Sequence, residues 1–442
     1  MKLLPIILIL LLILPVKAEI LEVCPNPYNS KAEYVKVRCN STCTLSDGEG
    51  EFNLSGGTHY VSKNATAFFK EFGFHPDSEF KGRFALSNEN DEIYLYEGGK
   101  LVDSFRYKNP KKGLIYFREN GEWKTKFEGW TDFKPVSDYV EGEIILTPSN
   151  FVFNADTIVS YTFTTDRYVR GNYTLYLDSK PIGGIPVNEM EIAKRHETHF
   201  LNSKSYKFFH WKFGLKGDDV VVTTENWKWD NLGFIVHFKS HRISEYLREV
   251  LRHDEVYSSN PGEVCEPKGF RSLGGVGRTY KFKGNITVFV LPDYNPIYDL
   301  MRGAKKELYV MAPYIGFKDT EFLKILRNKS CKVRVVVGRE DCAKFLEDFG
   351  RRNGLNMEVW VDKRVHGKMV IADDRAVITS ANFDYYGMSR NREIGVLIEG
   401  KVVEDLKGLF DREKDFYVYP ALLLLSLSVL AVYIYFKRLR AS

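Results

Sequence analysis

The 442-residue sequence contains no glutamine, although lysine and glutamate are abundant. This bias is typical of proteins from hyperthermophiles. The sequence also lacks a long basic block, and its net charge is only +5. The charge therefore gives no strong indication of a dedicated nucleic-acid-binding protein. No two cysteines have the Cys-x-x-Cys spacing, which argues against a zinc site.

Apolar segments occupy both ends of the chain. Residues 1–18 have a basic start, an apolar core and small residues before Glu19, which predicts a cleavable signal peptide. Residues 418–436 contain no charge and would form roughly 28 Å of helix at about 1.5 Å per residue, enough to span a membrane. The basic tail, 437–442, would stay in the cytoplasm. We therefore expect an extracellular body held at the cell membrane by one C-terminal helix.

An exported body permits disulfides among the six cysteines, for which fifteen pairings are possible. Cys331 and Cys342 bracket one predicted strand and turn, so a local bridge between them is a reasonable pairing. Six N-x-S/T sequons are compatible with a glycosylated exterior. They begin at Asn40, Asn53, Asn64, Asn172, Asn285 and Asn328.

The chain has enough apolar residues for real cores, and its length predicts two or three domains. In the first of these, 19–136, short alternating segments are separated by turn residues. Glu97–Lys100 is a hairpin signal between the alternating segment Glu92–Tyr96 and a returning strand at Leu101–Tyr107. This pattern predicts a β-sandwich.

The same segment resembles the lamin-tail, immunoglobulin-like domain. Glu33-Tyr34-Val35 matches the EYV strand of that family, and Leu86–Tyr107 matches its L-x-N-x-x-D-x-I-x-L hairpin. The resemblance implies an accessory domain that binds nucleic acid, protein or a cell-surface component.

The most informative stretch is Val365–Asn382, VHGKMVIADDRAVITSAN. His366 and Lys368 are one residue apart, which on an extended strand places their side chains on the same face. Asp373 follows, and the next apolar run ends just before Ser380. A histidine can attack phosphorus or donate a proton, and lysine and asparagine can hold charged oxygens. This set of side chains therefore suits a phosphodiester.

The same pattern occurs 156 residues earlier, at His210, Lys212, Thr224 and Asn226, with the same 16-residue spacing from histidine to asparagine. After each asparagine come a short loop, an apolar strand and an amphipathic helix. Because chance agreement at equal spacing is improbable, the sequence predicts an internal duplication.

The two copies define two α/β halves, 137–258 and 285–414, joined by a linker rich in Gly, Pro and Ser at 259–284. Strands alternate with helices in the second half, which implies a mostly parallel sheet covered on both faces. We therefore expect a multidomain chain: an immunoglobulin-like β-sandwich, a duplicated α/β fold and a C-terminal transmembrane helix.

The H-x-K-x4-D pattern followed by S-x-N resembles the phospholipase D superfamily, and the duplicated form resembles its two-lobed members. His366, Lys368 and Asp373 match the HKD signature of that superfamily, and Asn391-Arg392-Glu393 matches its distal N-x-E. The resemblance implies a duplicated phospholipase D-like fold whose first half, which departs from the pattern, is degenerate.

The resemblance also implies that His210 and His366 meet at the seam between the halves. One would attack phosphorus to form a phosphohistidine, and the other would protonate the leaving oxygen and then activate water. The residues leave open which histidine is the nucleophile. No metal or cofactor would be needed. The implied phosphate contacts come from Lys212, Lys368, Asn226 and Asn382 with help from Thr224 and Ser380, while Glu393 orients one imidazole.

Aromatic residues and two further histidines lie near these motifs in the sequence. The aromatic residues could stack bases, fill an acyl cleft or form core, and core packing is favoured for most of them; they are Trp211, Trp227, Trp229, Tyr385 and Tyr386. His196 and His199 have helical spacing but no third ligand of the right type nearby, so a surface pair is favoured over a metal site.

Three functions remain open on the sequence alone. The leading hypothesis is an exported, membrane-anchored phosphodiesterase, with nucleic acid favoured slightly over membrane phospholipid as the substrate. The alternative from another class is an inactive surface binding protein. Its support is that Gly217 replaces the acid of the first motif and that Gly233 stands where an acidic residue is expected.

Overall fold

The computed structural model describes residues 17–269, 277–316 and 320–411. The chain divides into two compact units, Met1–Trp130 and Thr131–Ser442. Nearly all of the predicted signal peptide, and the whole of the predicted membrane helix at 418–436 and tail at 437–442, lie outside the described residues. Within the described part of the chain, no helix is long and apolar enough to cross a bilayer.

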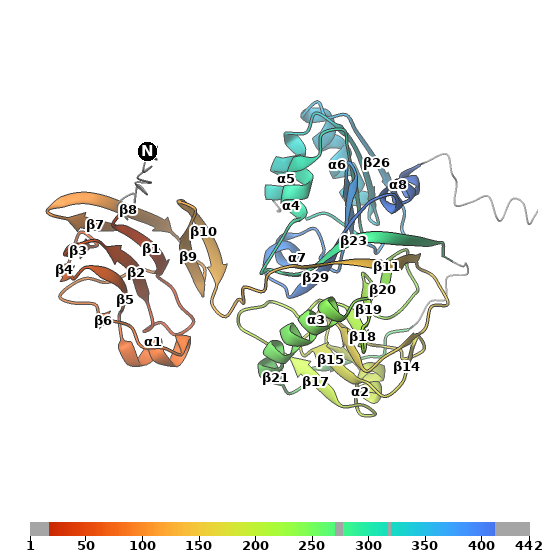
Figure 1. The fold of residues 1–442 in the computed structure, drawn as a ribbon, viewed down its shortest axis with the longest axis horizontal. Coiled ribbons are helices and arrows are strands. Elements are labelled where there is room, and N and C mark those ends of the chain that lie inside the picture. The colour runs from red at the N-terminus through yellow and green to blue at the C-terminus, as the bar shows by residue number, and fades with distance from the viewer. Residues whose placement is uncertain (1–16, 270–276, 317–319, 412–442) are drawn as a thin grey trace, which may run out of the picture. The chain divides into compact units, whose positions relative to one another are not determined.

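The N-terminal unit is a β-sandwich, as the alternating pattern predicts (Figure 1). One sheet has the order β10-β9-β1-β2-β5-β6 and the other β4-β3-β7-β8. Val35 and Val37 of the first sheet and Leu45 and Leu95 of the second are all fully buried in one core. The elements are β1 (Glu19–Cys24), β2 (Tyr34–Cys39), β3 (Cys43–Ser46), β4 (Glu51–Leu54), β5 (Gly57–Ser62), α1 (Ala65–Phe72), β6 (Ser78–Glu79), β7 (Asn90–Glu97), β8 (Lys100–Lys108), β9 (Leu114–Glu119) and β10 (Glu122–Phe127).

The C-terminal unit is built on one 15-stranded sheet with the order β21-β17-β15-β13-β18-β19-β20-β11-β23-β29-β28-β27-β24-β25-β26. Its first half contains β11 (Val136–Leu146), β12 (Phe153–Asn154), β13 (Thr157–Ser160), β14 (Val169–Arg170), β15 (Thr174–Asp178), β16 (Ile185–Pro186), α2 (Val187–Ala193), β17 (Thr198–Leu201), β18 (Phe213–Lys216), β19 (Asp219–Thr223), β20 (Phe234–Lys239), α3 (His241–Asp254), β21 (Ser258–Ser259) and β22 (Val264–Cys265). Its second half contains β23 (Thr279–Leu291), α4 (Ile297–Gly303), β24 (Glu307–Ala312), α5 (Thr320–Arg327), β25 (Lys332–Val337), α6 (Glu340–Arg352), β26 (Met357–Val361), β27 (Met369–Ala372), β28 (Arg375–Thr379), α7 (Tyr385–Ser389), β29 (Glu393–Glu399) and α8 (Val402–Lys407).

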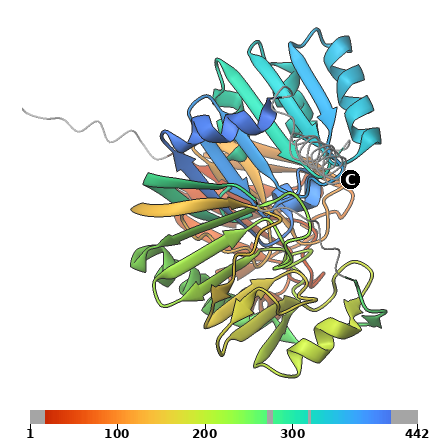
Figure 2. The same cartoon turned by 90° about the vertical axis from the view of Figure 1, so that its right-hand side faces the viewer.

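The strand order reads the same outward from the centre in both directions, which is the topology of an internal duplication. From β11 and β23 outward, β20 corresponds to β29, β19 to β28, β18 to β27 and β13 to β24. The central strands pair antiparallel from Val136↔Val288 to Ile145↔Thr279. Figure 2 shows these two strands side by side between the yellow-green half and the blue half.

Two predictions about this unit are wrong in detail. The sheet is mixed, because strands are parallel within β13-β15-β17 and β24-β25-β26 and antiparallel between their other neighbours. A tight turn joins β27 to β28, and so short a connection allows only antiparallel pairing. The predicted linker also ends early, since residues 279–284 already belong to β23 and pair with β11.

The predicted bridge between Cys331 and Cys342 is not formed, since the described cysteines are all free thiols. Cys342 instead packs in the core of the second half, where its sulfur accepts the backbone N–H of Ile315 at 3.3 Å. Core packing of the tryptophans is confirmed, since Trp211, Trp227 and Trp229 are at most 1% exposed.

Candidate active site

Both motif histidines stand just before a strand and are held there by the backbone of the opposite half. The N–H of His210 donates to the carbonyl of Arg392 at 2.8 Å, and the N–H of His366 donates to the carbonyl of Leu232 at 2.9 Å. His210 itself does not lie within a strand of the sheet. The strand β18 begins only at Phe213, because residues 207–210 bond to the segment before β29 rather than to a neighbour in the sheet.

Each histidine is paired with a glutamate from the other half. His210 Nδ1 lies 2.8 Å from Oε1 of Glu393, and His366 Nδ1 lies 2.9 Å from Oε1 of Glu225. An ionised carboxylate can only accept a hydrogen bond, so both imidazoles carry their proton on Nδ1. The Nε2 lone pair of each ring is therefore left for chemistry.

The two glutamates occupy non-equivalent positions of the duplication. Thr224 N–H donates to the carbonyl of Phe234 at 3.0 Å, and Ser380 N–H donates to that of Ile394 at 2.9 Å, so Phe234 corresponds to Ile394. Glu393 therefore corresponds to Gly233.

The carboxylate of Glu225 fills the space above Gly233. A Cβ at Gly233 would lie 2.1 Å from Oε1 of Glu225. In the second half, Ala381 stands at the position of Glu225, and the acid comes from Glu393 instead. Gly233 is thus no lost acid, because the same carboxylate function is supplied from eight residues earlier.

Two hydroxyl groups hold these carboxylates in matching ways. Thr224 Oγ1 donates to Oε1 of Glu225 at 3.1 Å, and Ser380 Oγ donates to Oε2 of Glu393 at 2.5 Å. Each hydroxyl also accepts the N–H of the following strand, from Phe234 and Ile394, at 3.0 Å. The hydroxyls predicted to assist phosphate binding are therefore engaged in positioning the glutamates.

The two motif lysines are buried and lie beside their histidines. Lys212 Nζ donates to the carbonyl of His210 at 2.5 Å, and Lys368 Nζ donates to that of His366 at 2.6 Å. Both residues are 0% exposed. Burial lowers the pKa of Lys212 to about 7 and that of Lys368 to about 8, although Glu393 and Glu225 oppose the change.

Burial and charge also set the ionisation of the two His–Glu pairs. Burial lowers the pKa of His210 to about 4, against the opposing effect of Glu393, and burial also lowers the pKa of His366. Burial acts to raise the pKa of Glu225, but His366 and Lys368 outweigh it and hold that pKa at about 2. Near neutral pH the carboxylates are therefore ionised and the imidazoles of the free protein are neutral.

Both motif asparagines have an unused polar atom at the site. Among the described residues, neither Oδ1 of Asn226 nor Oδ1 of Asn382 has a hydrogen-bond partner, although both atoms are buried. The two Oδ1 atoms thus stand in equivalent, buried environments in the two halves.

Asp373, which the sequence placed among the catalytic residues, lies at the far end of the β27–β28 hairpin from His366. Its carboxylate accepts the N–H groups of Lys305, Lys306 and Glu307 at 2.8 to 3.1 Å. Burial acts to raise the pKa of Asp373, but these three bonds outweigh it and lower the pKa. Asp373 therefore ties the hairpin turn to the start of β24, and its carboxylate is bonded there rather than to either motif histidine.

The loss of this acid in the first half has a matching explanation. Gly217 has φ +55° and Asp373 has φ +54°, so both turns need a left-handed residue. The first half keeps a hydrogen bond between this turn and the neighbouring strand, but the acceptor is on the other side. Here the turn donates, because Gly217 N–H bonds to Oδ2 of Asp156, directly before β13, at 3.1 Å.

A buried arginine that the sequence did not single out as functional joins the halves beside the site. Arg392 is fully buried and donates to Asp254 at 2.7 Å and to Asp293 at 3.0 Å. Its guanidinium lies 4.9 Å from the ring of Tyr206 and 5.5 Å from that of Trp211. Although burial opposes it, the two carboxylates raise the pKa of Arg392. Arg392 thus fixes the segment that delivers Glu393.

The other side chains of interest are structural. Tyr161 packs on His210 with ring centroids 4.6 Å apart. His196 and His199 stack on Tyr173 and Tyr176. In the described ranges, no cluster of His, Cys, Asp and Glu is suited to a metal ion.

The comparison with known families agrees with this geometry. Residues 297–414 match the family model described as "Cardiolipin synthase, PLD-like domain". Residues 297–414 thus resemble a phospholipase D-like domain. The match lies in the second half of the C-terminal unit and includes the second histidine motif, His366 and Lys368. No curated protein sequence matches the chain.

Solved structures of phospholipase D relatives are similar over part of the chain. They include Nuc, a phospholipase D family member from Salmonella typhimurium (17% identity, 28% of this chain and 90% of that chain, TM-score 0.25). NucT from Helicobacter pylori is similar at 14% identity over 28% of this chain and 92% of that chain, with a TM-score of 0.24. Phosphatidylserine synthase from Haemophilus influenzae Rd KW20 is similar at 12% identity over 60% of this chain and 80% of that chain, with a TM-score of 0.40.

Glu225, which pairs with His366, was missed by sequence reasoning. It stands in the segment Thr223-Thr224-Glu225-Asn226, directly before a residue predicted to bind phosphate. One signal was available in the sequence. The first half has Gly233 where the second half has Glu393, but it has Glu225 where the second half has Ala381.

Proposed function

We propose that the chain is an active phosphodiesterase that works through a phosphohistidine on His210. The observation that carries the proposal is the pair of crossed His–Glu contacts, His210 with Glu393 and His366 with Glu225. A neutral imidazole with its proton fixed on Nδ1 presents Nε2 as a nucleophile or base, and an imidazolium in the same place is an acid.

His210 suits the nucleophile better than His366. Its pKa of about 4 keeps the ring neutral over a wide pH range. Its side chain is 11% exposed, whereas that of His366 is 33% exposed. A more open position suits the residue that protonates the departing oxygen and later receives a proton from water.

The reaction then runs in two displacements. His366 enters the reaction as the imidazolium, which the ionised Glu225 and the anionic phosphate of the bound substrate stabilise. Nε2 of His210 attacks phosphorus while the ester P–O bond breaks, and the leaving oxygen takes the proton from Nε2 of His366, which becomes neutral. Glu393 stabilises the cationic phosphohistidine. A water that transfers its proton to His366 next attacks phosphorus, the P–N bond breaks, and neutral His210 is restored. Lys212 and Lys368 with the amides of Asn226 and Asn382 would hold the non-bridging oxygens.

We favour nucleic acid as the substrate, in an enzyme exported and anchored as the terminal sequences suggest. The resemblance of residues 19–136 to lamin-tail domains supports a nucleic-acid partner, and so does a basic pocket beside the site. Membrane phospholipid is the second candidate, because residues 418–436 have the composition of a membrane anchor. An inactive binding protein is disfavoured, since both apparent losses, Gly217 and Gly233, have structural compensations.

The test is turnover by the full-length chain in detergent with EDTA present. Single-stranded DNA, phospholipid vesicles and bis(p-nitrophenyl) phosphate are compared as substrates. We expect cleavage of DNA and of the small diester, and loss of turnover in His366→Asn and in His210→Asn. Turnover that requires added metal, or that survives both substitutions, would contradict the mechanism. Cleavage of vesicles but not DNA would establish the second candidate.

A further inference from the structure

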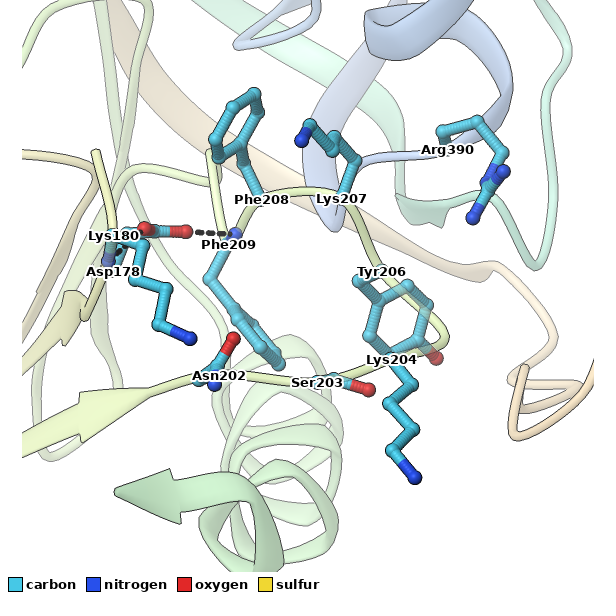
Figure 3. A pocket seen from close by; sticks show the side chains of 10 residues that line it. All are labelled: Asp178, Lys180, Asn202, Ser203, Lys204, Tyr206, Lys207, Phe208, Phe209 and Arg390. Atoms are coloured by element: carbon cyan, nitrogen blue, oxygen red, sulfur yellow. Dashed lines mark hydrogen bonds between the residues drawn. The ribbon is translucent and has the colours of Figure 1, made fainter. Parts of the chain in front are cut away.

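A basic pocket lies beside the catalytic centre in the first half (Figure 3). Its volume is about 240 Å³. Drug-sized ligands occupy pockets of about 300–1,000 Å³, so this one fits a smaller group. Its lining residues are Asp178, Lys180, Asn202, Ser203, Lys204, Tyr206, Lys207, Phe208, Phe209 and Arg390.

The lining contains four cationic side chains and only one carboxylate. Figure 3 shows Lys180 and Arg390 on opposite sides of the pocket. The carboxylate, Asp178, is buried and already accepts the N–H groups of Lys180 and Phe209, each at 2.7 Å. Burial raises the pKa of Asp178 to about 7, which reduces its charge near neutral pH. The pocket is therefore strongly electropositive.

The pocket and the catalytic centre are two ends of the same paired segments. Lys207 stands three residues before His210, and Arg390 stands three residues before Glu393. The segments are joined by Lys207 N–H to the carbonyl of Arg390 at 2.9 Å and by His210 N–H to that of Arg392 at 2.8 Å. Three extended residues span roughly 10 Å at about 3.3 Å each. Anything bound in the pocket thus lies within reach of a group held by the histidines.

The lining has the chemistry of a phosphate site with room for a sugar or base beside it. Lysine and arginine side chains bind phosphate oxygens, and Asn202 and Ser203 offer further hydrogen bonds. The rings of Tyr206 and Phe208 give the pocket two aromatic faces. Aromatic faces beside cations are what single-stranded nucleic acid uses for binding without sequence preference.

We propose that this pocket binds a second phosphate of a single-stranded nucleic acid whose scissile phosphate lies between His210 and His366. The inference rests on the proposed function for its substrate class. It assigns Lys180 and Lys207 as residues that select a polynucleotide over a small diester. Because the pocket contacts a backbone phosphate, it gives affinity without base preference.

The experiment measures binding rather than cleavage, so that a failure of the proposed catalysis stays distinguishable. The full-length His366→Asn chain is titrated into a fluorescent single-stranded oligonucleotide, and anisotropy is followed as a function of salt. Lys180→Ala/Lys207→Ala in that background is compared with Lys216→Ala/Lys239→Ala. The control pair removes the same charge from exposed positions at the other end of β18 and β20.

We expect the pocket variant to weaken oligonucleotide binding at least tenfold and the control pair to change it less than twofold. The slope of log K against log salt should fall by about 0.7 for each phosphate that the variant no longer neutralises. In the catalytic wild-type background, the ratio of kcat/KM for the oligonucleotide to that for bis(p-nitrophenyl) phosphate should fall by a similar factor. Equal weakening by both pairs would overturn the proposal, and so would no weakening. Loss of binding to anionic phospholipid vesicles with oligonucleotide binding intact would overturn it as well.

Discussion

Gly233 and Glu225 exclude one another, because a Cβ on Gly233 would lie 2.1 Å from Oε1 of Glu225. The half that carries Glu225 must therefore keep glycine at 233. The other half carries Ala381 and has space for Glu393. The carboxylate has exchanged positions between the two copies while the contact to histidine has been kept.

This exchange predicts a rescue. Glu225→Ala should lower kcat by about 10² or more, because His366 loses the group that fixes its tautomer and stabilises its protonated form. Glu225→Ala combined with Gly233→Glu recreates the arrangement of the second half and should recover at least tenfold of that loss. Gly233→Glu alone should be the least stable of the three. Steady-state kinetics measures kcat, and thermal unfolding measures stability. If the double variant has no higher kcat than Glu225→Ala, a glutamate at position 233 cannot replace Glu225.

The two histidines should differ in a single-turnover experiment. With bis(p-nitrophenyl) phosphate the leaving group departs without needing a proton, so His366→Asn should still release a burst of p-nitrophenol equal to one site and then stop. His210→Asn should give no burst. Stopped-flow absorbance and acid-labile phosphate on the chain are the measurements. A burst from His210→Asn instead would reverse the assignment of the nucleophile.

The buried groups predict an acidic pH optimum. The acid limb of kcat/KM should follow protonation of His210, whose pKa is about 4, because an imidazolium cannot attack. The alkaline limb should first follow loss of the proton that His366 gives to the leaving oxygen, because burial lowers the pKa of His366. It should then follow Lys212 and Lys368, with pKa values of about 7 and about 8, because the neutral amines no longer bind phosphate. A rate profile between pH 3 and 10 should therefore peak between about 4 and 7. A profile still rising at pH 9 would contradict the role of the lysines.

Lys212→Met should abolish activity and raise stability at pH 7. Burial disfavours the charged amine, so its pKa falls from 10.5 to about 7 on folding. Between these values the unfolded chain binds a proton that the folded chain does not, so wild-type stability rises with pH across this window. The advantage of the Met variant should therefore shrink from pH 7 to pH 10. In thermal unfolding, each kcal/mol of this stability difference should shift the midpoint temperature by roughly 2–4 °C. The exposed Lys216→Met variant is the control.

Asp373→Asn should separate structure from catalysis. Asparagine tolerates the left-handed backbone at this position, but its single neutral amide oxygen replaces the two carboxylate oxygens that share the three N–H groups, and its NH2 group cannot accept. We expect a loss of about 1–3 kcal/mol in unfolding free energy. The folded fraction should keep kcat within a few-fold of wild type, unlike Lys368→Met. A thousandfold loss of kcat in fully folded Asp373→Asn would return this residue to the chemistry.

The sequence predicted the sandwich, the duplication and most element bounds, because alternation, glycine turns and repeated spacing are local signals. The alternating apolar run of β25, Lys332–Val337, is one such local signal. The partners of the site were harder, since His366 and Glu225 are 141 residues apart and meet only through the paired centre of the sheet. The match to the family pattern also grouped Asp373 with His366 and Lys368, although Asp373 stands in the β27–β28 turn and His366 stands before β27. A sequence motif does not say which end of a hairpin each of its residues occupies.

The crossed pairs make catalytic competence a late event in the life of the chain. A ribosome that has delivered only the first half has released His210 without its carboxylate, because Glu393 belongs to the last strand of the second half. Cleavage of the connection between the halves would likewise leave the site dependent on the central β11–β23 contact. Formation of the two His–Glu contacts therefore reports that the whole C-terminal unit has assembled.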